Sequence, residues 1–173
     1  MANTTFSGPV RSEDGFDVVS KNSTTGAITT EFSLDGSGLQ VTPVTFSDAD
    51  TTLTATANAG RVNVVPAITG NRTLTLPSPS AGVWFRIVYG GAAEEAENLI
   101  IDTGADANFF IGGIVHIQSD ADSASVYSNG SSNSVLTLTD FGIFEINILA
   151  KDSTNWIIWG YQEGADVPAF ADQ

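Results

Sequence analysis

The chain has 173 residues, no cysteine, and 6 Lys and Arg against 20 Asp and Glu, which gives a formal net charge of −14. The missing cysteine excludes disulfides and thiolate zinc sites, the charge repels nucleic acid, and no apolar run approaches the roughly 20 residues needed to span a bilayer. We therefore expect a soluble protein without a secretion signal, a nucleic-acid groove or a membrane partner.

Residues 1–45 carry isolated hydrophobic residues between glycine-containing breaks such as Asp14-Gly15 and Asp35-Gly-Ser-Gly38. Each piece has too few apolar groups to offset the entropy lost on ordering. The segment is expected to be an extended N-terminal arm that leans on another surface, with the first hairpins of the domain as the alternative.

Residues 46–163 show the pattern of short strands separated by turn signals, which is typical of a sandwich or barrel. The composition, rich in Gly, Ser, Thr, Asn and Asp, also favours strands over helices. We predict an all-β, antiparallel β-sandwich of about 8–10 short strands. The expected strands are 52–57, 61–65, 73–76, 83–89, 98–102, 109–118, 125–127, 134–139, 142–150 and 155–161. The one helix candidate is Ala92–Glu97, and residues 164–173 are expected to be an acidic C-terminal tail.

The stretch from Thr73 to Tyr89 predicts a strand, a stiff corner and a second strand around which the core forms. Pro77 and Pro79 stop ladder pairing, and Gly82 lets the backbone turn back. We interpret the corner as scaffold and Trp84 as a packing residue.

The segment Trp156-Ile-Ile-Trp-Gly-Tyr161 is apolar on both faces of a strand. Trp156 and Ile158 share one face, which suits a sandwich core, whereas Trp159 and Tyr161 lie on the other. A neighbouring subunit or the N-terminal arm would cover that second face, and loops of the same chain are the alternative. We expect Trp159 and Tyr161 at or near a subunit interface.

One segment imitates a catalytic motif. Leu99-Ile-Ile-Asp-Thr-Gly-Ala-Asp106 resembles the active-site signature of retroviral-type aspartic proteases, with Asp102 as the candidate carboxylate and Ile157-Ile-Trp-Gly160 as the supporting segment. The same letters also describe a strand entering a turn, and the helix expected after the second segment is missing. We predict no catalytic residues and no enzyme.

The remaining polar candidates favour structural roles. His116, the only histidine, is expected at a core edge or an interface. The pairs Asp48/Asp50 and Asp120/Asp122 lack the ligand spacing of a calcium loop, so neither a metal nor a cofactor is predicted. Gly112-Gly113 is expected to mark a bulge or a close backbone approach.

Two sets of segments resemble structural proteins of tailed bacteriophages, especially marine ones. Thr4-Thr-Phe-Ser-Gly-Pro-Val-Arg-Ser-Glu-Asp-Gly-Phe16 resembles the N-terminus of small virion proteins. Segments 74–86, 110–113 and 155–160 resemble the β-sandwich of head-decoration and fibre-type proteins. The resemblance implies a capsid decoration (cement) protein with a jelly-roll-like domain, often a trimer.

In that role the chain would sit on the outer surface of the capsid, be assembled in the host cytoplasm, and hold neighbouring major capsid protein subunits together against DNA pressure. Phe6, Val10, Arg11 and Phe16 would contact the major capsid protein, and the chain would associate as a homotrimer. The alternative is a tail-fibre or receptor-binding β domain that contacts host surface glycans.

Overall fold

The computed structural model describes residues 15–35, 38–118 and 122–173, and the chain divides into two compact units, Met1–Thr42 and Pro43–Gln173. This division lies close to the expected boundary after residue 45. Phe6, Val10 and Arg11 lie outside the described residues.

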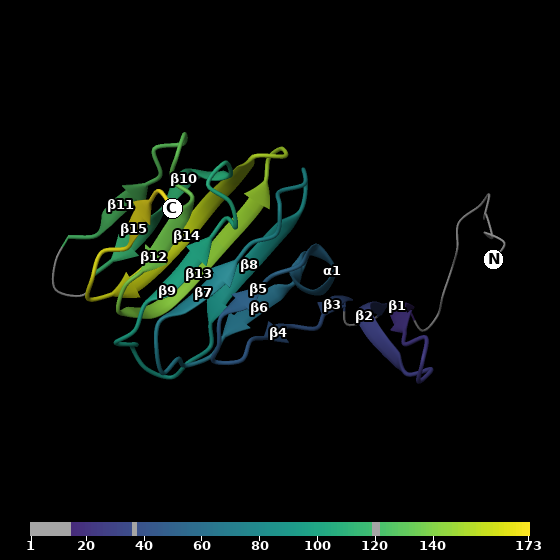
Figure 1. Ribbon diagram of the computed structural model, residues 1–173. Coiled ribbons are helices and arrows are strands. Elements are labelled where there is room, and N and C mark those ends of the chain that lie inside the picture. The colour runs from purple at the N-terminus through teal and green to yellow at the C-terminus, as the bar shows by residue number, and fades with distance from the viewer. Residues whose placement is uncertain (1–14, 36–37, 119–121) are drawn as a thin grey trace. The chain divides into compact units, whose positions relative to one another are not determined.

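The first unit contains a three-stranded antiparallel sheet, which we call the N-terminal sheet, in place of an extended arm (Figure 1). Its strands are β1 (Phe16–Lys21), β2 (Ile28–Asp35) and β3 (Gly38–Val41). The turn between β1 and β2 is organised by Asn22, whose Oδ1 accepts the backbone N–H groups of Thr24 and Thr25, and by Gly26 at φ +74°. The alternative of early hairpins therefore describes this segment better.

The second unit is an all-β sandwich of two sheets, as the sequence predicts (Figure 1). The large sheet has the order β11-β10-β14-β13-β8-β6-β4 and the small sheet the order β15-β12-β9-β7-β5. The strands of the large sheet are β4 (Val44–Thr45), β6 (Val62–Val65), β8 (Trp84–Tyr89), β10 (Phe109–Ile117), β11 (Ala124–Tyr127), β13 (Phe141–Ala150) and β14 (Asn155–Gly164). Those of the small sheet are β5 (Thr51–Thr52), β7 (Arg72–Thr75), β9 (Leu99–Asp102), β12 (Val135–Leu138) and β15 (Ala169–Ala171).

Strand direction differs from the antiparallel expectation. Antiparallel ladders join β13 to β8 and β14, β10 to β11, and β12 to β9 and β15. Parallel ladders join β10 to β14, β4 to β6, β6 to β8, β5 to β7 and β7 to β9. The sheets are mixed because consecutive strands often cross from one sheet to the other, as β7 does to β8, instead of forming hairpins within a sheet.

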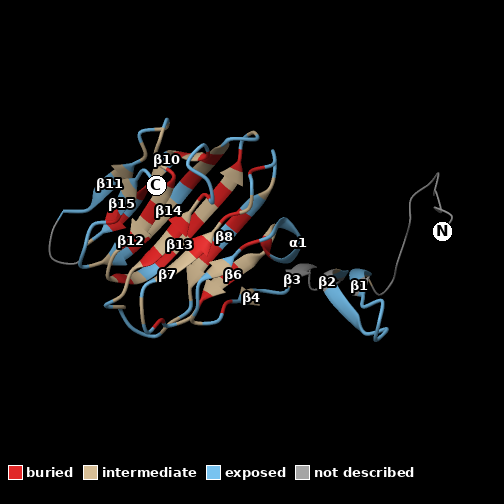
Figure 2. Ribbon diagram, in the orientation of Figure 1, coloured by how far each residue is buried: buried red, intermediate tan, exposed pale blue. Residues whose placement is uncertain are grey.

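The core lies between the two sheets, where alternate residues of each strand are buried (Figure 2). Phe85, Trp156 and Ile158 enter it from the large sheet, and Leu74 and Leu136 from the small sheet. This alternation confirms the predicted inner face of the segment 156–161.

Three local expectations are wrong. Residues 169–171 form β15 and pair with β12, so the C-terminus is not a tail, because Phe170 packs against Phe110 with ring centroids 6.0 Å apart. The end of the expected strand 52–57 is instead the helix α1 (Ala55–Asn58), because Thr54 caps it by accepting the N–H of Ala57. The expected helix at Ala92–Glu97 is absent, and that segment contains bends. Trp84 points away from the core and is 43% exposed, since Phe85 takes the buried position.

Gly112-Gly113 marks a close backbone approach, as predicted. A Cβ on Gly112 would lie 2.4 Å from the carbonyl oxygen of Ile158 on the parallel neighbour β14, and its φ is +111°. A Cβ on Gly113 would lie 2.3 Å from the carbonyl oxygen of Val126 on β11. These glycines allow β10 to sit between its two neighbours.

The substitution Gly112→Ala is expected to lower the free energy of unfolding by more than about 3 kcal/mol, because backbone strain and overlap with Ile158 add. Gly82→Ala is the matched control: Gly82 also has a positive φ, +87°, but its Cβ would meet nothing within 4 Å. We expect this control to lose only about 1–2 kcal/mol. Urea unfolding checks both values, and equal losses would contradict the overlap with Ile158.

Candidate functional site

The surface of the large sheet that faces away from the core, which we call the outer face, carries exposed large side chains. Trp159 on β14 is 48% exposed, and Val115 and Ile117 on β10 are also exposed. Tyr161 lies beside Val115 in the parallel ladder between β10 and β14. Trp159 and Tyr161, predicted near a subunit interface, therefore lie together on one open surface, and their burial by a subunit stays a prediction.

A groove of about 640 Å³ runs over this part of the outer face. Its apolar lining comes from Val115, Ile117, Trp159 and Tyr161, and its polar lining from Glu145 and Asn147 on β13. The alternation of each strand explains the groove, because the neighbours Trp156, Ile158 and Ile146 turn into the core.

Three polar side chains form a cluster beside the groove. The Arg86 guanidinium on β8 donates to Glu145 Oε2 at 2.9 Å, and Asn147 Nδ2 donates to Glu145 Oε1 at 3.1 Å. The hydrogen bond from Arg86, and to a smaller extent the hydrogen bond from Asn147, lowers the pKa of Glu145 below its ordinary value. Glu145 is thus held ionised and fixed in orientation on both oxygens.

Tyr127 on β11 extends the outer face beyond β10. It is 71% exposed and pairs in register with Gly113. A Cβ on Gly113 would lie 2.7 Å from Tyr127 Cδ1, so the missing side chain leaves room for the ring to lie against the backbone of β10. Sequence reasoning missed this residue, and the Gly112-Gly113 pair was the available signal that a neighbour sits unusually close.

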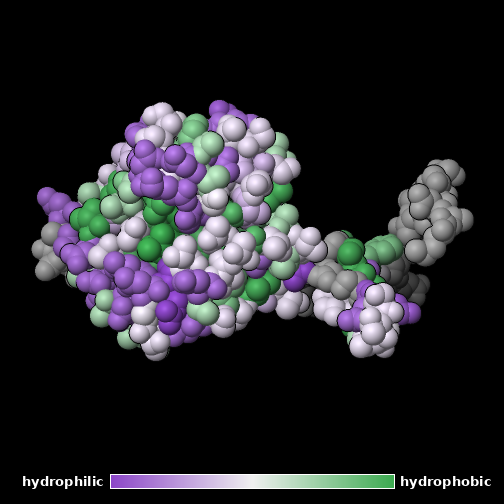
Figure 3. Space-filling model, in the orientation of Figure 1, coloured by the Kyte–Doolittle hydropathy of each residue, from purple (hydrophilic) through white to green (hydrophobic). Residues whose placement is uncertain are grey.

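Besides Val19 and Ile28 on its opposite side, the N-terminal sheet has a face with a row of exposed apolar side chains. Phe16 pairs with Leu34, and Val18 follows Phe16 by two residues, so these three side chains share that face together with Val41. Phe16, Val18 and Leu34 are 46%, 47% and 47% exposed. Figure 3 shows hydrophobic residues, in green, on the surface of this sheet. Phe16, predicted to contact a capsid, is therefore available to a partner.

Asp102 ends β9 and organises the turn that follows. Its Oδ1 accepts the N–H of Gly104 at 2.6 Å and bonds to the side chain of Gln173. Ile157–Gly160, the supporting segment of the protease-like pattern, lies in the large sheet, whereas Asp102 lies in the small sheet. The two parts of that pattern therefore lie in different sheets.

Asp48 and Asp50 fix loop backbone. Asp48 forms an ion pair with Arg72 at 2.7 Å and accepts hydrogen bonds from the backbone N–H and the hydroxyl of Thr69. These contacts lower the pKa of Asp48, and the hydrogen bond from Arg72 has the largest effect. Asp50 accepts the N–H of Thr73. Asp120 lies outside the described residues, and within the described ranges no three His, Asp or Glu side chains are grouped so as to hold a metal ion.

His116 is buried on the inner side of β10, where its Nε2 lies 2.9 Å from the carbonyl oxygen of Gly164. This contact connects β10 to the end of β14, as expected for a histidine at a core edge. Gln118 makes a parallel contact, donating from Nε2 to the carbonyl oxygen of Ala165 at 3.0 Å.

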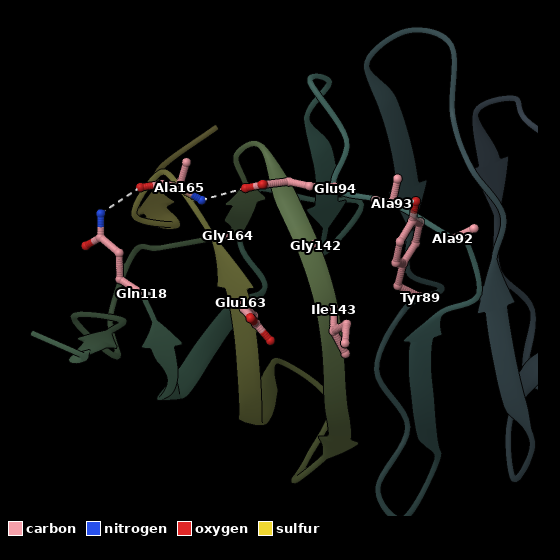
Figure 4. Close-up of a pocket in the computed structure, with 11 residues that line it drawn as sticks. Tyr89, Ala92, Ala93, Glu94, Gln118, Gly142, Ile143, Glu163, Gly164 and Ala165 are labelled. Atoms are coloured by element: carbon pink, nitrogen blue, oxygen red, sulfur yellow. Dashed lines mark hydrogen bonds between the residues drawn. The ribbon is translucent and has the colours of Figure 1, made fainter. Parts of the chain in front are cut away.

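A second cavity, of about 580 Å³, lies at the end of the large sheet where β8, β10, β13 and β14 meet (Figure 4). Glu94 borders it and accepts the N–H of Ala165 at 2.8 Å. Tyr89 points along the opposite wall toward Ala93, whose carbonyl oxygen lies 2.7 Å from its hydroxyl (Figure 4). These contacts fix the loop 90–97 and the segment after β14 against the sheet.

No protein-family model matches the chain, and no curated protein matches it. In the part of the chain that the structure describes, no helix is long and apolar enough to cross a membrane.

Burial, together with a hydrogen bond to Glu95, raises the pKa of Tyr89 to about 12. Because the protonated phenol is the favoured form, its contribution to stability is complete below about pH 10, the unfolded value, and is lost as pH rises towards 12. We expect a step near pH 12 when tyrosinate absorbance is followed, and we expect Tyr89→Phe to abolish that step. A titration curve of Tyr89→Phe that keeps the step near pH 12 would contradict this assignment.

Proposed function

We propose that the chain is a structural virion protein that binds the outer surface of a tailed-phage capsid and cements neighbouring major capsid protein subunits against internal DNA pressure. The observation that carries the proposal is the apolar face of the N-terminal sheet, at Phe16, Val18 and Leu34. These side chains are about half exposed, and none of the described side chains of the N-terminal sheet belongs to the buried core.

With three strands and no described side chain in the buried core, this sheet gains little stability from hydrophobic burial. Burying the apolar face against a partner would supply the missing core, so ordering and binding are expected to occur together. The N-terminal segment ending at Phe16 also resembles that of phage virion proteins, which makes the major capsid protein the partner we favour.

The two-unit organisation suits a cement role. The N-terminal sheet would attach to the capsid, while the sandwich, with its separate core, stays folded on the outside. A net charge of −14 would repel both the packaged genome and other particles. Attachment to several subunits at once opposes expansion, because binding free energy is lost when the lattice separates. The resemblance to decoration proteins also implies that the chain associates as a homotrimer. The proposed role is structural, not catalytic.

The rival role, a tail-fibre or receptor-binding domain, differs in copy number. Quantitative mass spectrometry of purified virions, with the major capsid protein as internal reference, separates the two. We expect hundreds of copies per particle and density on the head in a virion reconstruction. A few copies confined to the tail would overturn the cement proposal.

The double variant Phe16→Ser/Leu34→Ser should reduce binding of the full chain to capsids lacking it by at least tenfold, because it removes a cross-strand apolar pair from the proposed contact. Ile28→Ser is the matched control: Ile28 is 66% exposed but pairs with Lys21, on the opposite face of the sheet. Co-sedimentation with capsids measures both. Equal binding of both variants and the wild type would contradict the assigned face.

A further inference from the structure

We propose that the outer face of the large sheet binds a neutral glycan, which stacks on Tyr127 and Trp159 and forms hydrogen bonds with the cluster of Arg86, Glu145 and Asn147. This site is independent of the cement role. It would give a surface-bound protein a means of adhering to carbohydrate.

The strand register aligns the proposed contacts in one row. Tyr127 pairs with Gly113, Gly113 with Trp159, Trp159 with Asn147, and Asn147 with Arg86. Neighbouring strands are about 4.8 Å apart, so the row from β11 to β8 extends roughly 19 Å across the sheet. That length suits a short oligosaccharide better than a single sugar.

The aromatic end of the row offers flat apolar surface next to water. Tyr127 is the most exposed of the large hydrophobic side chains in the described ranges, and Gly113 leaves its ring room to lie against β10. Trp159 adds a second exposed ring at the groove. A pyranose has an apolar C–H face and a polar rim, and an aromatic ring beside hydrogen-bonding groups matches both.

The polar end of the row is already ordered. Glu145 is fixed on one oxygen by Arg86 and on the other by Asn147. A guanidinium has five N–H groups, and the bond to Glu145 uses one of them. Hydroxyl groups of a sugar can therefore bind to side chains whose orientation is fixed before binding.

The charge of the chain and the cost of desolvating the ion pair indicate which kind of ligand fits the groove. With a net charge of −14, the chain repels sulfated or uronic-acid polysaccharides. A protein surface closing over the groove would desolvate the ion pair of Arg86 and Glu145, at a cost, whereas sugar hydroxyls would keep it hydrogen-bonded. A neutral glycan satisfies both conditions.

The test applies the full chain to an array of neutral and acidic oligosaccharides, followed by calorimetry with the neutral one that binds best. We expect binding to neutral members, and Trp159→Ala and Tyr127→Ala should each weaken it by roughly tenfold. Trp84→Ala is the matched control, because Trp84 is 43% exposed on the same sheet but pairs with Leu149, outside this row. It should bind as the wild type does.

Three outcomes would overturn the proposal: no binding to any neutral oligosaccharide, preferential binding to acidic ones, or unchanged binding by both Trp159→Ala and Tyr127→Ala. Sedimentation velocity of the wild type and Trp159→Ala tests the competing occupant. Self-association that Trp159→Ala abolishes would assign the face to a second copy instead. None of these measurements involves capsids, so their failure and that of the cement role are distinguishable.

Discussion

The structure depends on one strand, β14, that carries large hydrophobic side chains on both of its faces. Trp156 and Ile158 are buried between the sheets, and Phe85 packs on Trp156 with ring centroids 5.8 Å apart. Pairing with β13 on one side and β10 on the other fixes the register of β14 along most of its length. Any change of register by one residue would move Trp156 out of the core and Trp159 into it, so the core itself determines which aromatic groups face outwards.

Glycine makes that arrangement sterically possible. β14 lies between two strands with which it exchanges backbone hydrogen bonds, and a Cβ on Gly160 would lie 2.0 Å from the carbonyl oxygen of Glu145. Gly112 has the same relation to Ile158 on the other side of β14. The close packing of β10, β14 and β13 therefore depends on missing side chains as much as on the hydrophobic ones. Tyr127 and Trp159 both pair with Gly113, one from each side of β10, so β10 places no side chain between them at this position.

The sequence predicts local features of the sandwich well and long-range ones poorly. Alternation and turn residues locate β7 to β14 closely, because each strand needs its own apolar face and its own break. Direction and partner depend on residues far apart, so the parallel pair β10–β14 and the C-terminal strand β15 could not be predicted from any single window. The site follows the same rule: Trp159 and Tyr161 stand out locally, whereas Arg86 and Glu145 are 59 residues apart and meet only through the register of β8 with β13.

The two units differ in where their stability comes from, and this difference separates their roles. The sandwich has a continuous core from both sheets, so exposed groups such as Trp159 and Tyr127 contribute little to folding and are free to be selected for binding. In the N-terminal sheet, the described apolar residues of β1 are about half exposed, so the order of that sheet and its contact with a partner are expected to be linked. A chain built in this way can attach through the part that a partner stabilises. The binding surface proposed for the sandwich would then be separate from that attachment.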